Sequence, residues 1–322
     1  MASASIEQGL SARASKQHSL WSDAWRRLAH NKVALVALGV IALFTLAATF
    51  ADQLTPWPID FQSRARANRG NGGVLLPPAW VQTGDPLSSG KPGFWLGTDD
   101  LGHDMLSRVI FGARVSMASG FVPMLLTLLV GSCIGLLAGY RGGWVDTLLM
   151  RLIDALYAFP DLLFTIIVIM ALRDTAVADL MGGFVMIVVA LSLLSWIGVA
   201  RLVRGQVLSL REKEFVTAAR AVGVPGWRIM LVHLLPNVLG PLIVTGTLAV
   251  RGYILAGATL EFLGIGVRPP TPTWGGMITD ALPYLISAPH MLWIPASCLL
   301  LITFAFNFLG DALVDALDPR LR

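Results

Sequence analysis

The fold is decided by a charge-free stretch in the first half of the chain, VSMASGFVPMLLTLLVGSCIGLLAGY, residues 115–140. An α-helix needs about 20 mostly apolar residues to cross the hydrocarbon of a bilayer, and this stretch is longer than that. Three more runs contain no charged residue and are nearly as long, at 33–50, 181–200 and 291–310. The chain is therefore predicted to be an all-α integral membrane protein.

The composition supports the same class of protein. Of the 322 residues, 55% are hydrophobic and only 14% are charged, which is too apolar for a soluble domain of this size. The net charge of +4 does not indicate nucleic-acid binding, because the Lys and Arg residues lie beside the apolar runs, where membrane topology alone places them. We expect contact with membrane lipid and none with nucleic acid.

Two further runs of spanning length contain charges. Residues 152–172 include Asp154 and Asp161 near their first end, and residues 238–263 include Arg251 and Glu261. Counting both gives six transmembrane helices, and an even number places both termini on one side of the membrane.

The distribution of basic residues predicts which side that is, because cytoplasmic segments carry an excess of Lys and Arg. The termini and the loops on their side contain Arg13, Lys16, Arg26, Arg27, Lys32, Arg141, Arg151, Arg201, Arg204, Arg211, Lys213, Arg220, Arg228, Arg320 and Arg322. The opposite loops contain fewer: Arg64, Arg66, Arg69, Lys91, Arg108, Arg114, Arg173 and Arg268. Both termini are predicted to be cytoplasmic.

This topology divides the chain into consecutive segments. They are a cytoplasmic N-terminal segment (1–32), a first transmembrane helix (33–50), an external loop (51–114), a five-helix core (115–310) with a cytoplasmic loop at 205–236, and a cytoplasmic tail (311–322). The first apolar run is also compatible with a secretory signal peptide. Its long basic leader, its length and the lack of a convincing A-x-A site favour a retained helix.

Three glycines recur at every fourth position of the second predicted span: Gly131, Gly135 and Gly139. This spacing places them on one helical face, where the backbone of another helix can approach closely. The stripe therefore predicts a helix-packing surface.

The cytoplasmic loop contains the stretch EFVTAARAVGVPGWRIMLVHLLPN, residues 214–237. It predicts a short helix with one face made of Phe215, Ala218, Ala219 and Val222 and other faces made of Lys213, Glu214, Thr217 and Arg220. Gly223 supplies the left-handed residue that ends a helix, and Pro225 prevents its continuation. A helix this short is marginal alone in water and needs a surface to pack against.

This loop resembles the "EAA" loop of ABC importer permeases, which docks into a cleft of the ATPase subunit. The matching pattern is A-A-x-x-x-G followed by L-P, here Ala218, Ala219, Gly223, Leu235 and Pro236. Thr217 stands where Glu is typical in the family, and His233 where an aliphatic residue is typical. The resemblance implies that Phe215, Thr217, Ala218, Ala219, Arg220 and Gly223 couple the chain to an ATPase.

Two other stretches are similar to the C-type permeases of dipeptide, oligopeptide and nickel importers. They are GTDDLGHDMLSRVIFGARVSM, residues 97–117, with His103 where Arg is usual, and FLGIGVRPPTPTWGGMI, residues 262–278. Just before the second stretch, Gly257 and Glu261 stand where a Glu and a Ser are more usual. All three matching stretches lie in the expected order and on consistent sides of the membrane.

The resemblance implies a type I importer permease in the bacterial inner membrane that forms half of a translocation pathway, with di- or oligopeptides as the first expected solute and nickel as the second. Its expected partners are a second permease, two ATPase subunits and an external solute-binding protein. The chain has no G-x-x-x-x-G-K-[ST] motif, so ATP and Mg are expected on the ATPase subunits. We expect a non-catalytic subunit with no cofactor of its own.

Other readings remain open from the sequence. In a secondary transporter driven by an ion gradient, Asp161, Arg251 and Glu261 would be the coupling charges; in an importer they are candidates for the pathway. Asp99, Asp100, His103 and Asp104 include ligand types for a divalent metal. We interpret them instead as helix capping, with Asp99 or Asp100 as the N-cap and Asp104 in the first turn, and expect no metal site.

Overall fold

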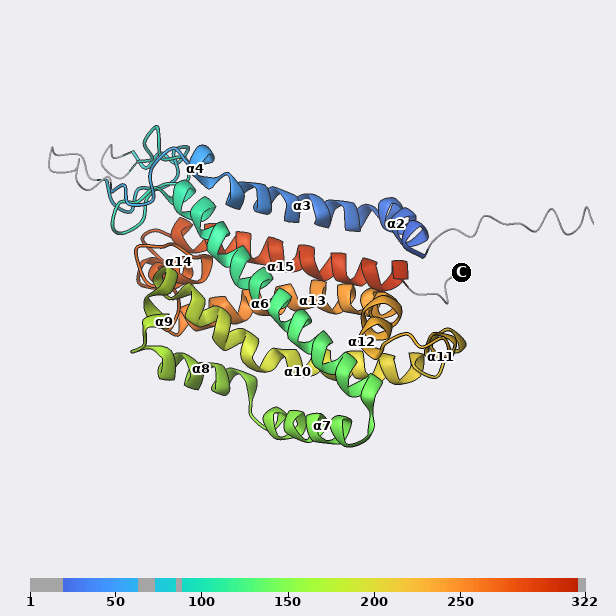
Figure 1. The fold of residues 1–322 in the computed structure, drawn as a ribbon. Helices are drawn as coiled ribbons and strands as arrows, with labels where there is room; N and C mark the ends of the chain where they lie inside the picture. The colour runs from blue at the N-terminus through green and yellow to red at the C-terminus, as the bar shows by residue number, and fades with distance from the viewer. Residues whose placement is uncertain (1–19, 63–72, 85–88, 318–322) are drawn as a thin grey trace, which may run out of the picture.

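The computed structural model describes residues 20–62, 73–84 and 89–317, and the regular secondary structure of these residues is helical apart from one isolated bridge between Thr98 and Asp104. Five helical stretches are long and apolar enough to cross a membrane (Figure 1). They are α3 (Lys32–Thr49), α6 (Met105–Arg141), the stretch Ala176–Leu210, the stretch Gly226–Phe262, and α15 (His290–Leu317).

Two of these stretches are made of several elements. The first consists of α9 (Ala176–Asp179), the 3₁₀ turn η1 (Leu180–Gly183) and α10 (Phe184–Leu210); the second consists of α12 (Gly226–Arg228), the π-helical η2 (Ile229–Leu234) and α13 (Leu235–Phe262). Pro236 is the second residue of α13, directly after the π-helical η2, and it has no backbone N–H to donate to that preceding turn.

The remaining predicted span, 152–172, is not one continuous helix. The structure divides it into α7 (Gly143–Tyr157) and α8 (Asp161–Leu172), which meet at an angle of 86° and count as a sixth span only if taken together. Pro160 immediately precedes α8, and a proline can begin a helix but cannot continue one without losing a backbone hydrogen bond. The apolar composition of the run did not reveal this break.

Several helices extend beyond the predicted apolar runs. Asp104 is the N-cap of α6, where its side chain accepts from Ser107 N–H, so this helix begins at Met105 rather than at 115. Likewise, α10 continues to Leu210 and α15 to Leu317. Apolar runs mark the part of a helix in lipid, whereas polar termini continue the helix into water.

The two ends of the helix bundle differ in their elements (Figure 1). The end that we call the inner end carries α2 (Leu20–His30), α11 (Glu214–Ala221), α12 and the end of α15; the outer end carries α4 (Ala51–Leu54), α9 and α14 (Trp274–Ala281). The first described helix and the end of the last one thus lie at the same end, as an even number of spans requires. Some of the basic residues that predicted the orientation lie outside the described residues: Arg13, Lys16, Arg64, Arg66, Arg69, Arg320 and Arg322.

The most extensive helix packing among the described residues joins α6 to α10. Gly131, Gly135 and Gly139 all face α10: a Cβ atom at Gly135 would lie 2.6 Å from the carbonyl oxygen of Ala200, and one at Gly139 would lie 2.8 Å from the Cβ of Val207. Carbon atoms in favourable contact are about 3.5–4.0 Å apart, so even an alanine would push the two helices apart. The three glycines form one contact surface.

Candidate functional site

The inner end presents the short helix α11, which ends in a defined capping motif. Gly223 follows the helix with φ of +81°, and its N–H donates to the carbonyl of Arg220 at 3.0 Å. The N–H of Val224 donates to the carbonyl of Ala219, also at 3.0 Å. This pair of bonds is a Schellman motif, which needs a left-handed residue at the position of Gly223. The sharp end of α11 therefore depends on this glycine.

The predicted apolar face of α11 is divided in the structure. Val216 and Ala219 are buried against the chain's own helices, at 0% and 7% exposure, while Phe215, Ala218 and Val222 face outward, the last with 79% exposure. The sequence placed Ala219 with the outward residues and overlooked Val216. The difference arises because a helix of eight residues needs an inward face to stay attached to the bundle.

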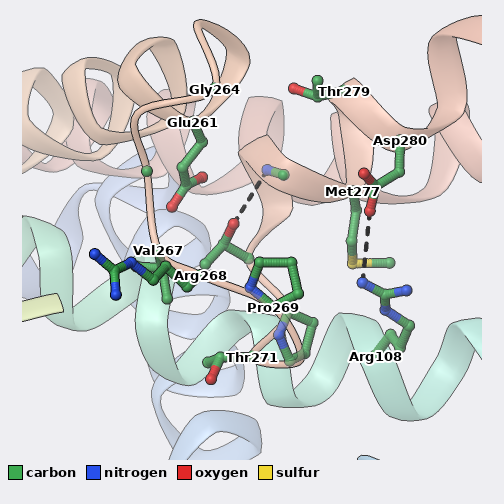
Figure 2. A pocket seen from close by; sticks show the side chains of 14 residues that line it. Arg108, Glu261, Gly264, Val267, Arg268, Pro269, Thr271, Met277, Thr279 and Asp280 are labelled. Carbon is green, nitrogen blue, oxygen red and sulfur yellow. Dashed lines mark hydrogen bonds and ion pairs between the residues drawn. The ribbon is translucent and has the colours of Figure 1, made fainter. Parts of the chain in front are cut away.

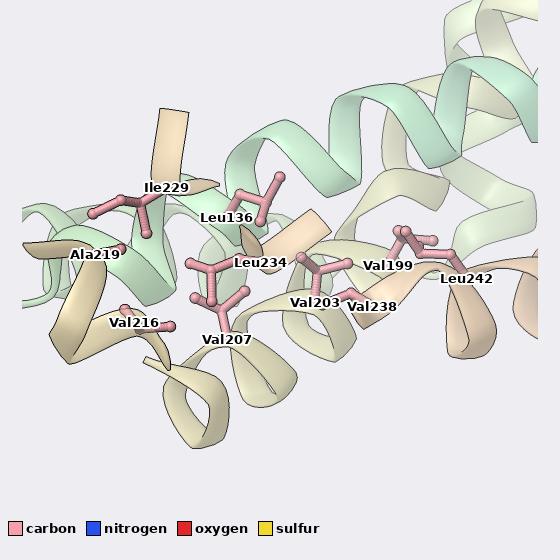
Figure 3. Close-up of a cluster of buried hydrophobic side chains, with 10 residues drawn as sticks. All are labelled: Leu136, Val199, Val203, Val207, Val216, Ala219, Ile229, Leu234, Val238 and Leu242. Atoms are coloured by element: carbon pink, nitrogen blue, oxygen red, sulfur yellow. The ribbon is translucent and has the colours of Figure 1, made fainter. Parts of the chain in front are cut away.

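The inward face belongs to the largest apolar cluster at this end (Figure 3). Val216 and Ala219 pack with side chains from four other elements, α6, α10, η2 and α13: Leu136, Val199, Val203, Val207, Ile229, Leu234, Val238 and Leu242. Close-packed interiors transmit displacement because they leave little free space. A force applied to α11 is therefore transmitted to three membrane helices.

The other residues expected to couple the chain to an ATPase lie on the sides of α11. Thr217 is exposed and donates through its hydroxyl to the carbonyl of Lys213 at 2.9 Å. The guanidinium of Arg220 lies over the ring of Tyr140 at 5.1 Å, a cation–π contact that also links α11 to the end of α6. Gly223 has no atom within 4 Å of the position of a Cβ, so its constraint is its backbone conformation.

The three candidate pathway charges do not come together. Asp161 is exposed at the start of α8. Arg251 lies in α13, where its guanidinium donates to the side-chain oxygen of Asn307 in α15. Glu261 lies near the outer end of α13. This separation gives no support to a single site in which the three charges exchange ions.

Glu261 is buried beside an outer cavity of about 240 Å³ (Figure 2). Its carboxylate faces the amino end of α14, where the hydroxyl of Thr273 and the backbone N–H groups of Gly275 and Gly276 are its hydrogen-bonding neighbours. A Cβ at Gly275 would lie only 2.2 Å from the Glu261 oxygen Oε2. The glycine therefore makes room for the carboxylate.

A second group of charges surrounds the start of α6 at the outer end. Asp99 accepts from the N–H of His103 at 2.7 Å, from its ring Nδ1 at 2.8 Å, and from the guanidinium of Arg108, which also lies 3.6 Å from Asp280. The N-cap of α6 is Asp104, so the predicted cap at Asp99 or Asp100 is wrong. Asp99 instead ties the loop before the helix to the helix itself.

Burial and ion pairing shift the pKa values of these carboxylates in opposite directions. Burial alone would raise the pKa of Asp99, but the hydrogen bond from His103 and the charge of Arg108 outweigh it, so this pKa lies below its ordinary value. For Asp280, burial outweighs the charge of Arg108 and raises the pKa. The sequence contained no signal for the pairing of Arg108 with Asp280, because more than 170 residues separate them in the chain.

Comparison with protein families gives two matches. The model described as "Binding-protein-dependent transport system inner membrane component" matches residues 131–322. The model of the "N-terminal TM domain of oligopeptide transport permease C" matches residues 19–78. The first match contains α11, and the second contains α2 and α3.

Curated proteins of known name are similar over almost the whole chain. The dipeptide transport system permease protein DppC of Haemophilus influenzae is 37% identical over 92% of this chain and 94% of its own. The oligopeptide transport system permease protein OppC of Bacillus subtilis is 38% identical over 95% and 92%. The glutathione transport system permease protein GsiD of Pectobacterium atrosepticum is 37% identical over 94% and 92%.

Among solved structures, an inward-facing conformation of the MetNI methionine ABC transporter has the same fold. One of its chains superposes with a TM-score of 0.52 and 17% identity, over 66% of this chain and 98% of that chain. At this identity the likeness concerns the fold alone.

Proposed function

Because the chain belongs to the family of binding-protein-dependent transport system inner membrane components, we propose that α11 is the element through which an ATPase subunit moves its membrane helices. As a member of this family, the chain is a multi-pass inner-membrane permease of a bacterial ABC transporter and is not itself catalytic. Membership also implies partner ATPase subunits within a transporter complex.

One observation carries the proposal: the outward apolar face of α11 has no partner within the described chain. Phe215 and Val222 are 42% and 79% exposed on the outward side, although Val216 on the inward side is fully buried. Exposed apolar residues on a rigid short helix are typical of a docking surface, in which a helix enters a groove. The buried face keeps the helix attached to the bundle while the exposed face engages the partner.

The proposed coupling is a mechanical one. Closure of a pair of ATPase subunits around ATP and Mg displaces α11, and the cluster shared by α6, α10, η2 and α13 passes this displacement to the spans. The bundle then exchanges between inward-open and outward-open arrangements, as a packed two-state element does when a partner binds one state more tightly. A second permease subunit would complete the pathway, and an external binding protein would deliver the solute.

We propose peptides as the solute class. The relatives named above are dipeptide, oligopeptide and glutathione permeases, and all these solutes contain a peptide bond. The binding protein is a separate chain and sets much of the specificity, so the class rests on relatives rather than on residues of this chain.

The coupling proposal is tested by an Ala→Asp exchange at two exposed positions of the inner end. Ala218→Asp places a charge on the docking face of α11, and Ala29→Asp places the same charge on α2. In proteoliposomes containing the whole complex, we expect the first variant to lose uptake and ATPase stimulation and the second to keep both. Equal uptake by the two variants would refute a docking role for α11.

A further inference from the structure

We propose that the outer cavity beside Glu261 binds the ammonium group of a peptide on its way into the membrane pathway. This inference rests on the proposed transport of peptides. The permease would itself bind the terminal ammonium group, which all unmodified peptides share whatever their side chains.

The wall of the cavity contains both acidic and basic side chains. Glu261, at 9% exposure, and Asp280 contribute carboxylates; Arg108 and Arg268 contribute guanidinium groups. Arg108 is paired with Asp99 outside the wall as well as with Asp280 at 3.6 Å, and Arg268 is paired with Asp179 at 3.0 Å. Glu261 is therefore the carboxylate of the wall that has no arginine partner.

Glu261 has no cationic partner among the described residues. Within the part of the chain that the structure describes, no Lys, Arg or His forms an ion pair with it. A buried carboxylate is costly unless hydrogen bonds and an opposite charge compensate it. The hydroxyl of Thr273 and the backbone N–H groups at the amino end of α14 face its carboxylate, and an arriving cation would supply the missing charge.

The geometry of the cavity favours an ammonium over a metal ion. The described residues contain no group of three or more His, Cys, Asp or Glu side chains placed to hold a metal, whereas Ca²⁺ and Mg²⁺ require about six or more oxygen ligands. An ammonium has three N–H donors, and Glu261, Asp280 and the hydroxyls of Thr271 and Thr279 line the same cavity. Figure 2 shows Glu261 and Asp280 on opposite sides of the cavity, with the Asp280 carboxylate turned to Arg108, so Glu261 would be the main acceptor of the ammonium group.

The size of the cavity indicates how much of a solute enters it. Its volume of about 240 Å³ is below the range of about 300–1,000 Å³ that is usual for drug-sized ligands. The amino-terminal part of a peptide fits this space better than a whole oligopeptide. The rest of the peptide would extend out of the cavity, which leaves its length and side chains unselected.

The first experiment measures binding without transport. In the intact complex, Cys133 and Cys298 of this chain are replaced by Ala, and Val267→Cys provides a reactive thiol in the cavity wall. We expect alanylalanine to slow labelling by a water-soluble thiol reagent, N-acetyl-alanylalanine not to slow it, and Glu261→Gln to abolish the difference. Equal protection by the two peptides, or protection that survives Glu261→Gln, would overturn the proposal.

The second experiment measures uptake by the complex with its binding protein. We expect Glu261→Gln to raise the KM for alanylalanine about tenfold, the effect of losing one charge-assisted contact, while binding-protein-stimulated ATP hydrolysis continues and Glu261→Asp restores part of the uptake. An unchanged KM, or loss of ATP hydrolysis in both variants, would refute the site. If the unmodified complex imports no peptide, the proposed function itself fails, which is a separate outcome.

Discussion

The elements that carry the two proposed sites lie at opposite ends of the bundle and are held by different kinds of interaction. At the inner end, α11 is attached by apolar side chains such as Val216 and Leu234, and a glycine stripe joins α6 directly to α10. At the outer end, charged and hydrogen-bonded groups connect the loop before α6 to that helix, with Asp99 bound by His103 and Arg108. Close apolar packing passes a displacement on to its neighbours, whereas each ion pair fixes two particular groups.

The tryptophan of α14 shows how the outer end is fixed in place. Trp274 is fully buried, its ring N–H donates to the carbonyl of Val109 at 3.0 Å, and its backbone N–H donates to the hydroxyl of Ser116 at 3.1 Å. Both acceptors belong to α6. Helix α6, whose glycines pack against α10 toward the inner end, therefore also positions the amino end of α14 beside Glu261.

The largest expected effect on stability is at the outer end. Asp99→Ala removes the carboxylate that pairs with Arg108 and His103, and breaking a buried ion pair costs about 3–5 kcal/mol. Because Asp280 lies 3.6 Å from Arg108 and remains a partial partner, we expect the lower part of this range. Hydrogen exchange in purified complex should increase around residues 97–108 and stay unchanged in α11. Increased hydrogen exchange at both ends would mean that the two ends do not open independently of each other.

The same carboxylate predicts a pH dependence. Its pKa in the folded protein lies below the ordinary value, so its contribution to stability is complete above the ordinary Asp pKa of about 3.9 and is lost as the pH falls through the lower folded value. Thermal unfolding of the unmodified complex should therefore show an acid-side loss that Asp99→Asn removes. An identical pH profile for both proteins would contradict the role of Asp99.

A smaller effect is expected where α6 meets α10. Gly135→Ala forces a Cβ to within 2.6 Å of the Ala200 carbonyl oxygen, and such overpacking costs about 1–3 kcal/mol. Gly198→Ala in α10, where no atom lies within 4 Å of the new Cβ, should instead stabilise by about 0.5–1 kcal/mol through helix propensity. Thermal unfolding of the two variants should shift in opposite directions, and a shift of the same sign would show that the helices do not pack this closely.

The smallest expected loss of stability is at Gly223, although the functional effect there is large. Gly223→Val places a β-branched residue at φ of +81°, at a cost of about 1–2 kcal/mol, and should raise the ATP hydrolysed per solute imported because α11 no longer ends in a fixed geometry. Gly223→Asn is the matched control, since Asn tolerates this conformation. If the Val variant hydrolyses no more ATP per solute imported than the unmodified complex, the capping motif has no part in the mechanism.

The sequence predicts these features to different extents. Charge-free runs locate the spans, and the i, i+4 spacing of Gly131, Gly135 and Gly139 predicts a packing face, because both signals are local. The break before α8 has a local signal in Pro160, which counting apolar residues does not weigh. The inward position of Ala219 depends on neighbours far along the chain, which a helical pattern does not contain. The contact between Glu261 and the amino end of α14 similarly requires a loop to fold back on the helix that precedes it.

The central claim is that the outward face of α11 contacts an ATPase subunit. It is tested most directly by placing a photoreactive amino acid at position 222 in the intact complex, with the same amino acid at position 29 as the control. We expect irradiation to join position 222, and not position 29, to the ATPase subunit in a band that mass spectrometry identifies. Attachment of position 222 only to lipid or to this chain itself would contradict the account.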